Sequence, residues 1–333
     1  MQVIASAPGK AILFGEHAVI YGKPAIAVAI DKKARVKIRE RIDSKTHVEV
    51  PGLGISEYLE PENDVIHEKQ INKGILDYIS KSLKKVNQLS GLKKQNGMDI
   101  NVDLEIPIGS GLGSSAAVTV ATITALSFYN KLEFKKDEIA NYAHQVELDV
   151  QGAASPIDTT LSTYGGVIYL SRNSEEITHL PLNWNPSLII GYTDRESNTR
   201  ELVESVRIKK ESYPSVINPI MDSIEQITDN AREAIVCENA EILGELMNIN
   251  HGLLDALGVN TPELSRMVYI ARKAGAIGSK ITGAGGGGSI IAYSPNKIDE
   301  VLGELQRVEN AFIIKLSSLG VQQEVGRTWK RRI

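Results

Sequence analysis

Apolar and polar residues alternate along two stretches of the amino-terminal half. Residues 34–40 and 98–106 carry apolar side chains at every second position, which is the period of a strand with one buried face. Shorter apolar runs predict further strands at residues 3–5, 11–14 and 25–30. Pro8 and Gly9 separate the first two runs, and residues 47–50 are expected to form a hairpin with residues 34–40. The first fifty residues are therefore predicted to be mostly β.

Three later stretches have helical patterns. Residues 63–87 place apolar side chains near a 3.6-residue period, with lysines on the other face. Residues 118–129 form an uncharged run without Gly or Pro, long enough for about three turns. Many of its residues are β-branched and form helices poorly, so we expect it to be a buried helix on a sheet. A third helix is predicted from Asp137, as its N-cap, to about Gln151.

The carboxyl-terminal half begins after an irregular stretch with two prolines at residues 180–186. Its predicted elements are a strand at 188–193, helices over 215–273, strands on both sides of Gly283–Gly288, a helix at 296–308 and a strand at 311–316. This order resembles a ferredoxin-like sheet. The sequence is therefore predicted to be α+β, with domains over residues 1–182 and 183–333.

Residues 107–117 read Pro-Ile-Gly-Ser-Gly-Leu-Gly-Ser-Ser-Ala-Ala and lie between a predicted strand and a predicted helix. A Gly/Ser loop at a helix start gathers free N–H groups and a positive dipole end, which suits phosphate. A glycine-rich turn without a ligand is the alternative. The dinucleotide-binding fingerprint fails because position 114 is Ser, and no Walker A motif occurs in the chain. The pattern thus predicts an anion loop of neither common type.

Composition and charge exclude several classes of protein. The net charge of −4 argues against nucleic acid as a main partner. Residues 106–130 carry no charge, but their glycines and hydroxyl residues make a membrane span unfavourable. Cys237 is the only cysteine, which excludes an intrachain disulfide or a thiolate metal cluster and fits a reducing cytosol. With no signal-peptide pattern at the amino terminus, we expect a cytoplasmic protein.

Two carboxylates and a second glycine run are candidates for chemistry. Glu147 lies at the edge of the apolar stripe of its helix, where it needs either a lysine partner or a metal ion. Asp158 is the one acid of a predicted loop over residues 152–166, and it either caps a turn or takes part in chemistry. Gly283–Gly288 has the composition of a linker, but its flanking strands favour a second close approach to an anion.

Three stretches in order along the chain together resemble the GHMP kinases, which are named for their galactose, homoserine, mevalonate and phosphomevalonate substrates. They are Ala7-Pro-Gly-Lys10 with its continuation, residues 107–117, and Lys280-Ile-Thr-Gly-Ala-Gly-Gly-Gly-Gly288. Within the family, residues 10–22 resemble the branch that phosphorylates mevalonate, as does the spacing of Glu147 and Asp158. Gln151 departs from the animal members, which usually have His there, and resembles archaeal-type members.

The resemblance implies a fold and an activity. The fold is an amino-terminal domain like domain 2 of ribosomal protein S5, followed by a ferredoxin-like domain. The activity is ATP-dependent phosphorylation of the C5 hydroxyl of (R)-mevalonate in isoprenoid biosynthesis, with ATP and Mg²⁺ as cofactors. The resemblance also implies a homodimer. Alternatives are another GHMP kinase, for homoserine or phosphomevalonate, and a non-catalytic ligand sensor on the same fold.

Site residues follow from the same resemblance. Asp158 is expected to be the general base and Lys10 to stabilise the developing charge. Ser115 and Glu147 are expected to hold Mg²⁺. Substrate contacts are assigned to Glu16, His17 and Thr199, although Glu16 next to Lys10 in this pattern also allows a simple ion pair. ATP contacts are assigned to Pro107, Ile108, Gly109, Ser110, Gly111, Leu112, Gly113, Ser114, Ser115, Ala116, Ala117, Gly285 and Gly286.

Overall fold

The computed structural model describes residues 2–59, 73–91, 97–152, 154–181, 186–194 and 198–324. Within these residues the first sheet has eight strands, in the order β12-β1-β2-β5-β3-β4, with β6 paired to β2 and β7 to β6. The strands are β1 (Gln2–Phe14), β2 (Ala25–Glu40), β3 (Thr46–Val50), β4 (Ile55–Leu59), β5 (Met98–Leu104), β6 (Val167–Leu170), β7 (Ile177–Leu180) and β12 (Gln322–Glu324).

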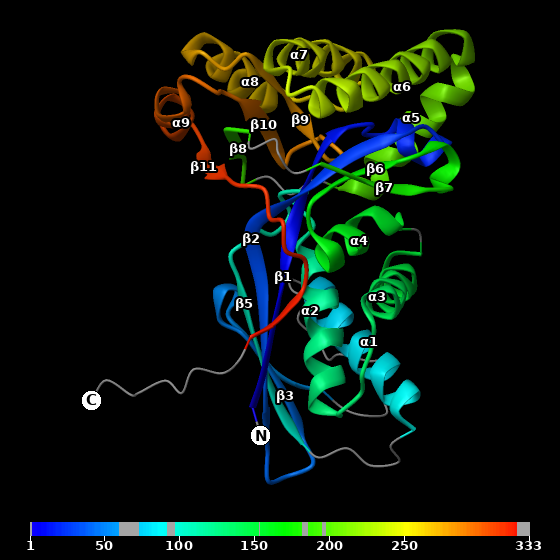
Figure 1. The fold of residues 1–333 in the computed structure, drawn as a ribbon, viewed down its shortest axis with the longest axis vertical. Helices are drawn as coiled ribbons and strands as arrows, with labels where there is room; N and C mark the ends of the chain where they lie inside the picture. Colours follow the sequence, from blue (N-terminus) through cyan, green and yellow to red (C-terminus); the bar gives the residue numbers. More distant parts are fainter. Residues whose placement is uncertain are drawn as a thin grey trace.

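Helices cover one face of this sheet (Figure 1). They are α1 (Lys73–Ser90), α2 (Ser114–Tyr129), α3 (Lys136–Gln151) and α4 (Pro156–Tyr164). Helix α2 packs on β1 and β2, and α1, α3 and α4 surround it. All its residues from Ala116 to Ser127 are buried, so tertiary packing supports a helix of β-branched residues, as the sequence predicted. No helix in the described part of the chain is long and apolar enough to span a membrane.

The second unit is a four-stranded antiparallel sheet with the order β11-β8-β10-β9. This is the strand order of a ferredoxin-like sheet, so the prediction for the carboxyl-terminal half is confirmed. Helices lie over the sheet at the top of the molecule (Figure 1). Its elements are β8 (Leu188–Tyr192), α5 (Thr199–Ser212), α6 (Pro214–Val236), α7 (Ala240–Ala256), α8 (Pro262–Ala274), β9 (Gly278–Thr282), β10 (Ser289–Tyr293), α9 (Ile298–Gln306) and β11 (Asn310–Ile314).

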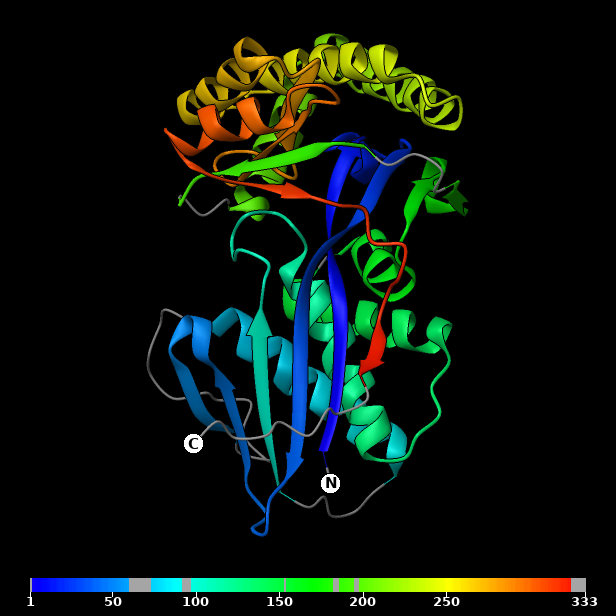
Figure 2. The same cartoon turned by 60° about the vertical axis from the view of Figure 1, so that its left-hand side comes forward.

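Several connections hold the units together, among them a returning strand and an ion-pair cluster. After β11 the chain returns to the first sheet, where β12 pairs antiparallel with β1 (Figure 2). On the other side, Lys23 Nζ lies 2.6 Å from Asp222 Oδ1 and 2.7 Å from Glu225 Oε2 of α6. The predicted boundary after residue 182 lies outside the described residues and stays a prediction. Residues 322–324, which follow the second unit in the sequence, thus contribute to the first sheet.

Three strand predictions were wrong. Residues 2–14 form one strand, because a register shift between Pro8 and Lys10 lets pairing with β2 continue past Pro8 and Gly9. Residues 25–30 and 34–40 likewise belong to one strand, β2. Strand β3 does not pair with β2: it pairs antiparallel with β4 and parallel with β5. The alternation in the sequence showed that these residues are strands but not which strands are neighbours.

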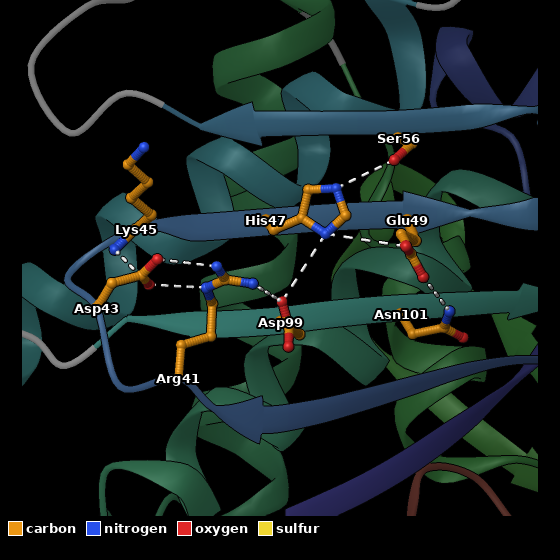
Figure 3. Close-up of polar contacts among 8 residues, drawn as sticks. All are labelled: Arg41, Asp43, Lys45, His47, Glu49, Ser56, Asp99 and Asn101. Atoms are coloured by element: carbon orange, nitrogen blue, oxygen red, sulfur yellow. Dashed lines mark hydrogen bonds and ion pairs between the residues drawn. The ribbon is translucent and has the colours of Figure 1, made fainter.

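Polar pairs on the open face of the sheet match this pairing of β3 (Figure 3). His47 lies opposite Asp99 of β5, with His47 Nδ1 3.8 Å from Asp99 Oδ1. Two register positions further along, Asn101 donates a hydrogen bond to Glu49 at 3.3 Å. Arg41 Nη1 lies 2.6 Å from Asp99 Oδ1. Such cross-strand pairs support a register, and the network forms no metal-binding group within the described residues.

The helix limits also differ from prediction. Helix α3 begins at Lys136 with Lys135 as N-cap, so Asp137 is not the cap and lies in the first turn. The predicted loop over residues 152–166 contains α4, whose N-cap Ser155 accepts from the Ile157 N–H and whose first residue is proline. Of the predicted helix at 63–87, residues 63–72 lie outside the described part, and α1 continues to Ser90.

Candidate active site

The glycine loop between β5 and α2 has the geometry of an anion site. Gly109, Gly111 and Gly113 have φ of 72°, 77° and 73°, which L side chains rarely adopt. Gly113 is the N-cap of α2 and offers no side-chain cap, so the first N–H groups of the helix remain available. Ser110 Oγ donates to the Pro107 carbonyl at 2.6 Å and holds the loop. This arrangement suits a phosphate group.

The second glycine loop contacts the first. Ser289 Oγ donates a 2.8 Å hydrogen bond to the Ser110 carbonyl. The Gly286 N–H donates to the Val259 carbonyl at 2.7 Å. Gly283–Gly288 is therefore held between β9 and β10 and against residues 109–110, and it is not a free linker. The two glycine loops belong to different units and lie against each other.

Lys10 and Asp158 meet beside the first loop. Lys10 Nζ lies 3.2 Å from Asp158 Oδ2, and only 7% of the Lys10 side chain is exposed, so Lys10 is not merely a surface charge. The Lys10 N–H donates to the Leu112 carbonyl at 2.9 Å, which places Lys10 against the loop. A Cβ at Gly113 would lie 2.7 Å from Lys10 Cγ. Asp158 is in the first turn of α4, where the helix dipole favours a carboxylate.

Glu147 and Ser115 form a second polar pair. Ser115 Oγ donates to Glu147 Oε1 at 3.2 Å, and Glu147 is buried. Burial, with a smaller contribution from Asp158, raises the pKa of Glu147 to about 8, against the lowering effects of Ser115 and Lys10. No salt bridge joins Glu147 to a lysine or arginine among the described residues. Two oxygen donors, one of them a buried carboxyl without such a partner, fit a hard divalent cation.

Glu16 and His17 are buried where the two units meet. Glu16 forms an ion pair with Lys280, and Asn250 Nδ2 donates to Glu16 Oε2 at 3.3 Å. Glu16 therefore does not pair with Lys10. His17 has a strained φ of 60°, and its Nε2 donates to the Ala284 carbonyl at 2.8 Å. Burial lowers the pKa of His17, and its buried Nδ1 has no hydrogen-bond partner in the described part of the chain.

Thr199 is the one predicted substrate residue that is exposed. It is the first residue of α5, after the N-cap Asn198. Within the described residues, no hydrogen bond joins it to the other predicted site residues. The structure thus brings together Lys10, Asp158, Ser115 and Glu147, places Glu16 and His17 beside the second glycine loop, and leaves Thr199 without such a contact.

Several residues of this region were not singled out from the sequence. Lys280 was part of a quoted motif, but nothing indicated that it would pair with Glu16. Ser162 Oγ donates to the Pro8 carbonyl at 2.9 Å and fixes α4 against β1. Asn250 and Tyr78 gave no signal. Gln151 was noted only as a departure, although it lies one helical turn after Glu147 and so shares its face.

Family models and relatives show the family of the chain. Residues 77–166 match the model of the GHMP kinases N terminal domain, and residues 231–311 match GHMP kinases C terminal. A protein named mevalonate kinase from Methanothermobacter thermautotrophicus is 48% identical over 96% of this chain and 100% of its own length. The chain belongs to the GHMP kinase family. A second mevalonate kinase, from Pyrococcus furiosus, is 48% identical over 90% of this chain and 92% of its own.

Solved structures of GHMP kinases have the same fold. The crystal structure of Methanococcus jannaschii mevalonate kinase has a TM-score of 0.82 and 34% identity, covering 95% of this chain and 99% of that one. The L. major mevalonate kinase, solved in complex with R-mevalonate, has a TM-score of 0.80 and 25% identity over 93% of this chain and 94% of that one. The predicted family and two-domain fold are confirmed.

Proposed function

We propose that this GHMP kinase transfers the γ-phosphoryl group of ATP to the C5 hydroxyl of (R)-mevalonate, giving 5-phosphomevalonate and ADP in isoprenoid biosynthesis. The observation that carries the proposal is the Lys10–Asp158 pair beside a phosphate loop. The names of the relatives that share nearly the whole chain support mevalonate as the substrate.

Asp158 and Lys10 divide the chemistry between them. The carboxylate of Asp158 takes the proton of the C5 hydroxyl as a bond forms from that oxygen to the γ-phosphorus. The bond from the γ-phosphorus to the β-γ bridging oxygen breaks, and ADP keeps the electron pair. The ammonium of Lys10 stabilises the negative charge on the transferring group. Phosphoryl transfer needs little else from the protein than such positioning and charge stabilisation.

The glycine loops bind the nucleotide in this proposal. Amides of Gly109–Ser115 at the start of α2 contact the phosphates, and Gly285 and Gly286 cover them from the other unit. Ser115 and Glu147 supply oxygen ligands for Mg²⁺, which neutralises phosphate charge when bound. The burial of Glu147 and its hydrogen bond with Ser115 orient the two oxygens before the cation binds.

His17 and Thr199 are assigned to the substrate, and Glu16 is assigned to the support of His17. His17 Nδ1 is an unused acceptor in a buried, neutral ring, so it can accept a hydrogen bond from a substrate hydroxyl. Each carboxylate oxygen of Glu16 already has a partner, Lys280 on Oε1 and Asn250 on Oε2, so we assign Glu16 to holding the segment that carries His17. Thr199 is assigned to the transferred phosphate from the start of α5.

A substrate panel tests the proposal. The purified chain with ATP and Mg²⁺ is offered (R)-mevalonate, phosphomevalonate, homoserine and galactose, and ADP formation is measured together with the phosphorylated product. We expect turnover with mevalonate and a loss of about 10²–10⁴-fold in kcat for Asp158→Asn. Preference for another alcohol would overturn the substrate assignment. ATP binding without turnover on any alcohol would favour a ligand sensor instead.

A further inference from the structure

A hydrogen-bonded chain of side chains lies behind Ser115. Tyr78 of α1 is buried with 8% of its surface exposed, and Gln151 Nε2 of α3 donates to Tyr78 Oη at 2.6 Å. Burial raises the pKa of Tyr78, whereas hydrogen bonds with Gln151 and Ser115 lower it. Since Ser115 also donates to Glu147, residues from three helices are linked in the order Gln151, Tyr78, Ser115, Glu147.

Helix α3 supplies both ends of this chain. Glu147 and Gln151 are four residues apart and lie on one face of the helix. The same helix thus carries the carboxyl beside Ser115 and the amide that fixes the Tyr78 ring. A shift of Tyr78 would therefore move Ser115 relative to Glu147. Within the described residues, Tyr78 makes no hydrogen bond to Gly109 or Gly111 of the first glycine loop.

The Ser115 hydroxyl needs a hydrogen-bond acceptor when its oxygen ligates a cation, and Tyr78 can be that acceptor. A serine oxygen that ligates a cation uses a lone pair for the metal, so its proton must point away from the cation to an acceptor. Glu147 would be a poorer acceptor in that state, because its carboxylate would ligate the same cation. Tyr78 Oη has two lone pairs, one of which accepts from Gln151. The other is available to Ser115, the second hydrogen-bond partner of Tyr78.

We propose that Tyr78, fixed by Gln151, is a positioning residue for the divalent cation: it accepts a hydrogen bond from the Ser115 hydroxyl when Ser115 and Glu147 ligate the ion. The inference rests on the proposed function for the assignment of these two ligands. Outer-shell partners of this kind typically change metal affinity by about 10–100-fold when removed. They orient the ligands and need not contact the substrate.

Mn²⁺ binding to the full chain with a non-hydrolysable ATP analogue tests the inference without turnover. Free Mn²⁺ is followed by electron paramagnetic resonance, and Ser115→Ala and Glu147→Gln define the effect of losing a ligand. For Tyr78→Phe we expect about tenfold weaker Mn²⁺ binding. Tyr169→Phe is the matched control, because the equally buried Tyr169 hydroxyl donates to Asp229 at 2.8 Å on another side of the molecule.

Gln151 variants provide the second arm, which decides the matter even if Tyr78→Phe fails to fold. Gln151→Leu removes the N–H donor, and we expect several-fold weaker Mn²⁺ binding. Gln151→His restores an N–H donor and should recover the affinity. The KM for mevalonate should change little in these variants, which separates them from a general loss of structure.

The outcomes separate the two proposals. The inference is supported if Tyr78→Phe and Gln151→Leu weaken Mn²⁺ binding while Tyr169→Phe does not. It is overturned if Tyr78→Phe behaves like Tyr169→Phe and Gln151→Leu like wild type. If Ser115→Ala and Glu147→Gln leave Mn²⁺ binding unchanged, the ligand assignment and the inference both fail. If the substrate panel rejects mevalonate but the Mn²⁺ pattern holds, the proposed substrate fails and the inference stands.

Discussion

Lys10 Nζ and Asp158 Oδ2 lie 3.2 Å apart, although they come from the first strand and from α4. Two further bonds hold this pair in position. The backbone N–H of Lys10 donates a hydrogen bond to the Leu112 carbonyl in the first glycine loop. The Ser162 hydroxyl of α4 donates a hydrogen bond to the Pro8 carbonyl of β1. Asp158, Lys10 and the first glycine loop are therefore held together by contacts within the protein, which is what the preorganised catalysis proposed above requires.

Replacing Lys10 by Met should lower kcat by about 10²–10³-fold, because the charge of the transferring phosphoryl group loses its nearest side-chain cation. The KM for ATP should change much less, since the loop amides remain. Steady-state kinetics with mevalonate measure both values. Lys45→Met, at an exposed position beside the open face of the sheet, is the control and should match wild type. A Lys10→Met enzyme within threefold of wild-type kcat would contradict the role.

Ser162→Ala should reduce activity through the position of α4. The buried hydroxyl donates to the Pro8 carbonyl, and its loss should cost about 1 kcal/mol of stability. Since the bond joins α4, which carries Asp158, to β1, which carries Lys10, we expect kcat to fall several-fold as well. Ser127→Ala is a matched control, because it loses a buried 2.9 Å bond to the Thr124 carbonyl at a distance from the site. Equal kcat values for the two variants would show that the Ser162 hydrogen bond does not position α4 for catalysis.

Gly113→Ala should impair catalysis more than its backbone strain alone explains. The residue has a φ of 73°, and an added Cβ would lie 2.7 Å from Lys10 Cγ, so Lys10 must move. We expect a loss of roughly 1–2 kcal/mol of stability and a kcat at least tenfold lower. Gly54→Ala shares the positive φ but has nothing within 4 Å of its Cβ. Thermal unfolding and kinetics of both variants separate strain from displacement of Lys10.

The sequence allowed the family, the two-unit fold and the glycine loops to be predicted because these depend on local residue types. Glycines at positions of positive φ and the periodic apolar residues of a buried face can each be recognised within a short stretch of sequence. Sheet neighbours leave no such mark, which is why β3 was assigned to β2. The partners of Glu16 and of Tyr78 come from residues far along the chain, and only the packed structure brings them together.

Lys280→Met should destabilise the protein strongly, because Glu16 would remain buried without its cation. Both side chains are almost fully buried, and burial lowers the pKa of Lys280 while Glu16 raises it. Removing one member of such a pair costs about 3–5 kcal/mol, whereas removing both costs less. The double variant Glu16→Gln with Lys280→Met should therefore be more stable than Lys280→Met alone. Denaturant unfolding measures the coupling, and additive losses would argue against a direct pair.

Because of His251, the free energy of unfolding should decrease as the pH is lowered below about 6.5. Burial in α7, with Arg272 and Lys280 nearby and Asp255 acting oppositely, lowers its pKa from 6.5 to about 4. Between about pH 4 and pH 6.5, His251 is therefore mostly protonated in the unfolded chain and mostly neutral in the folded chain. The stability from the neutral ring is complete above about pH 6.5 and is lost as the pH falls towards 4, by about 3 kcal/mol at most.

Variants isolate this effect from other acid-sensitive groups. His251→Gln carries no titrating ring, so its melting temperature should fall less between about pH 7 and pH 4.5 than that of wild type. The slope should not vanish, because burial also lowers the pKa of His17 and His144. His179→Gln, at an exposed position on β7, should keep the wild-type slope. If His251→Gln and His179→Gln show equal acid sensitivity, protonation of His251 does not drive the loss of stability, and the buried ring tolerates its charge.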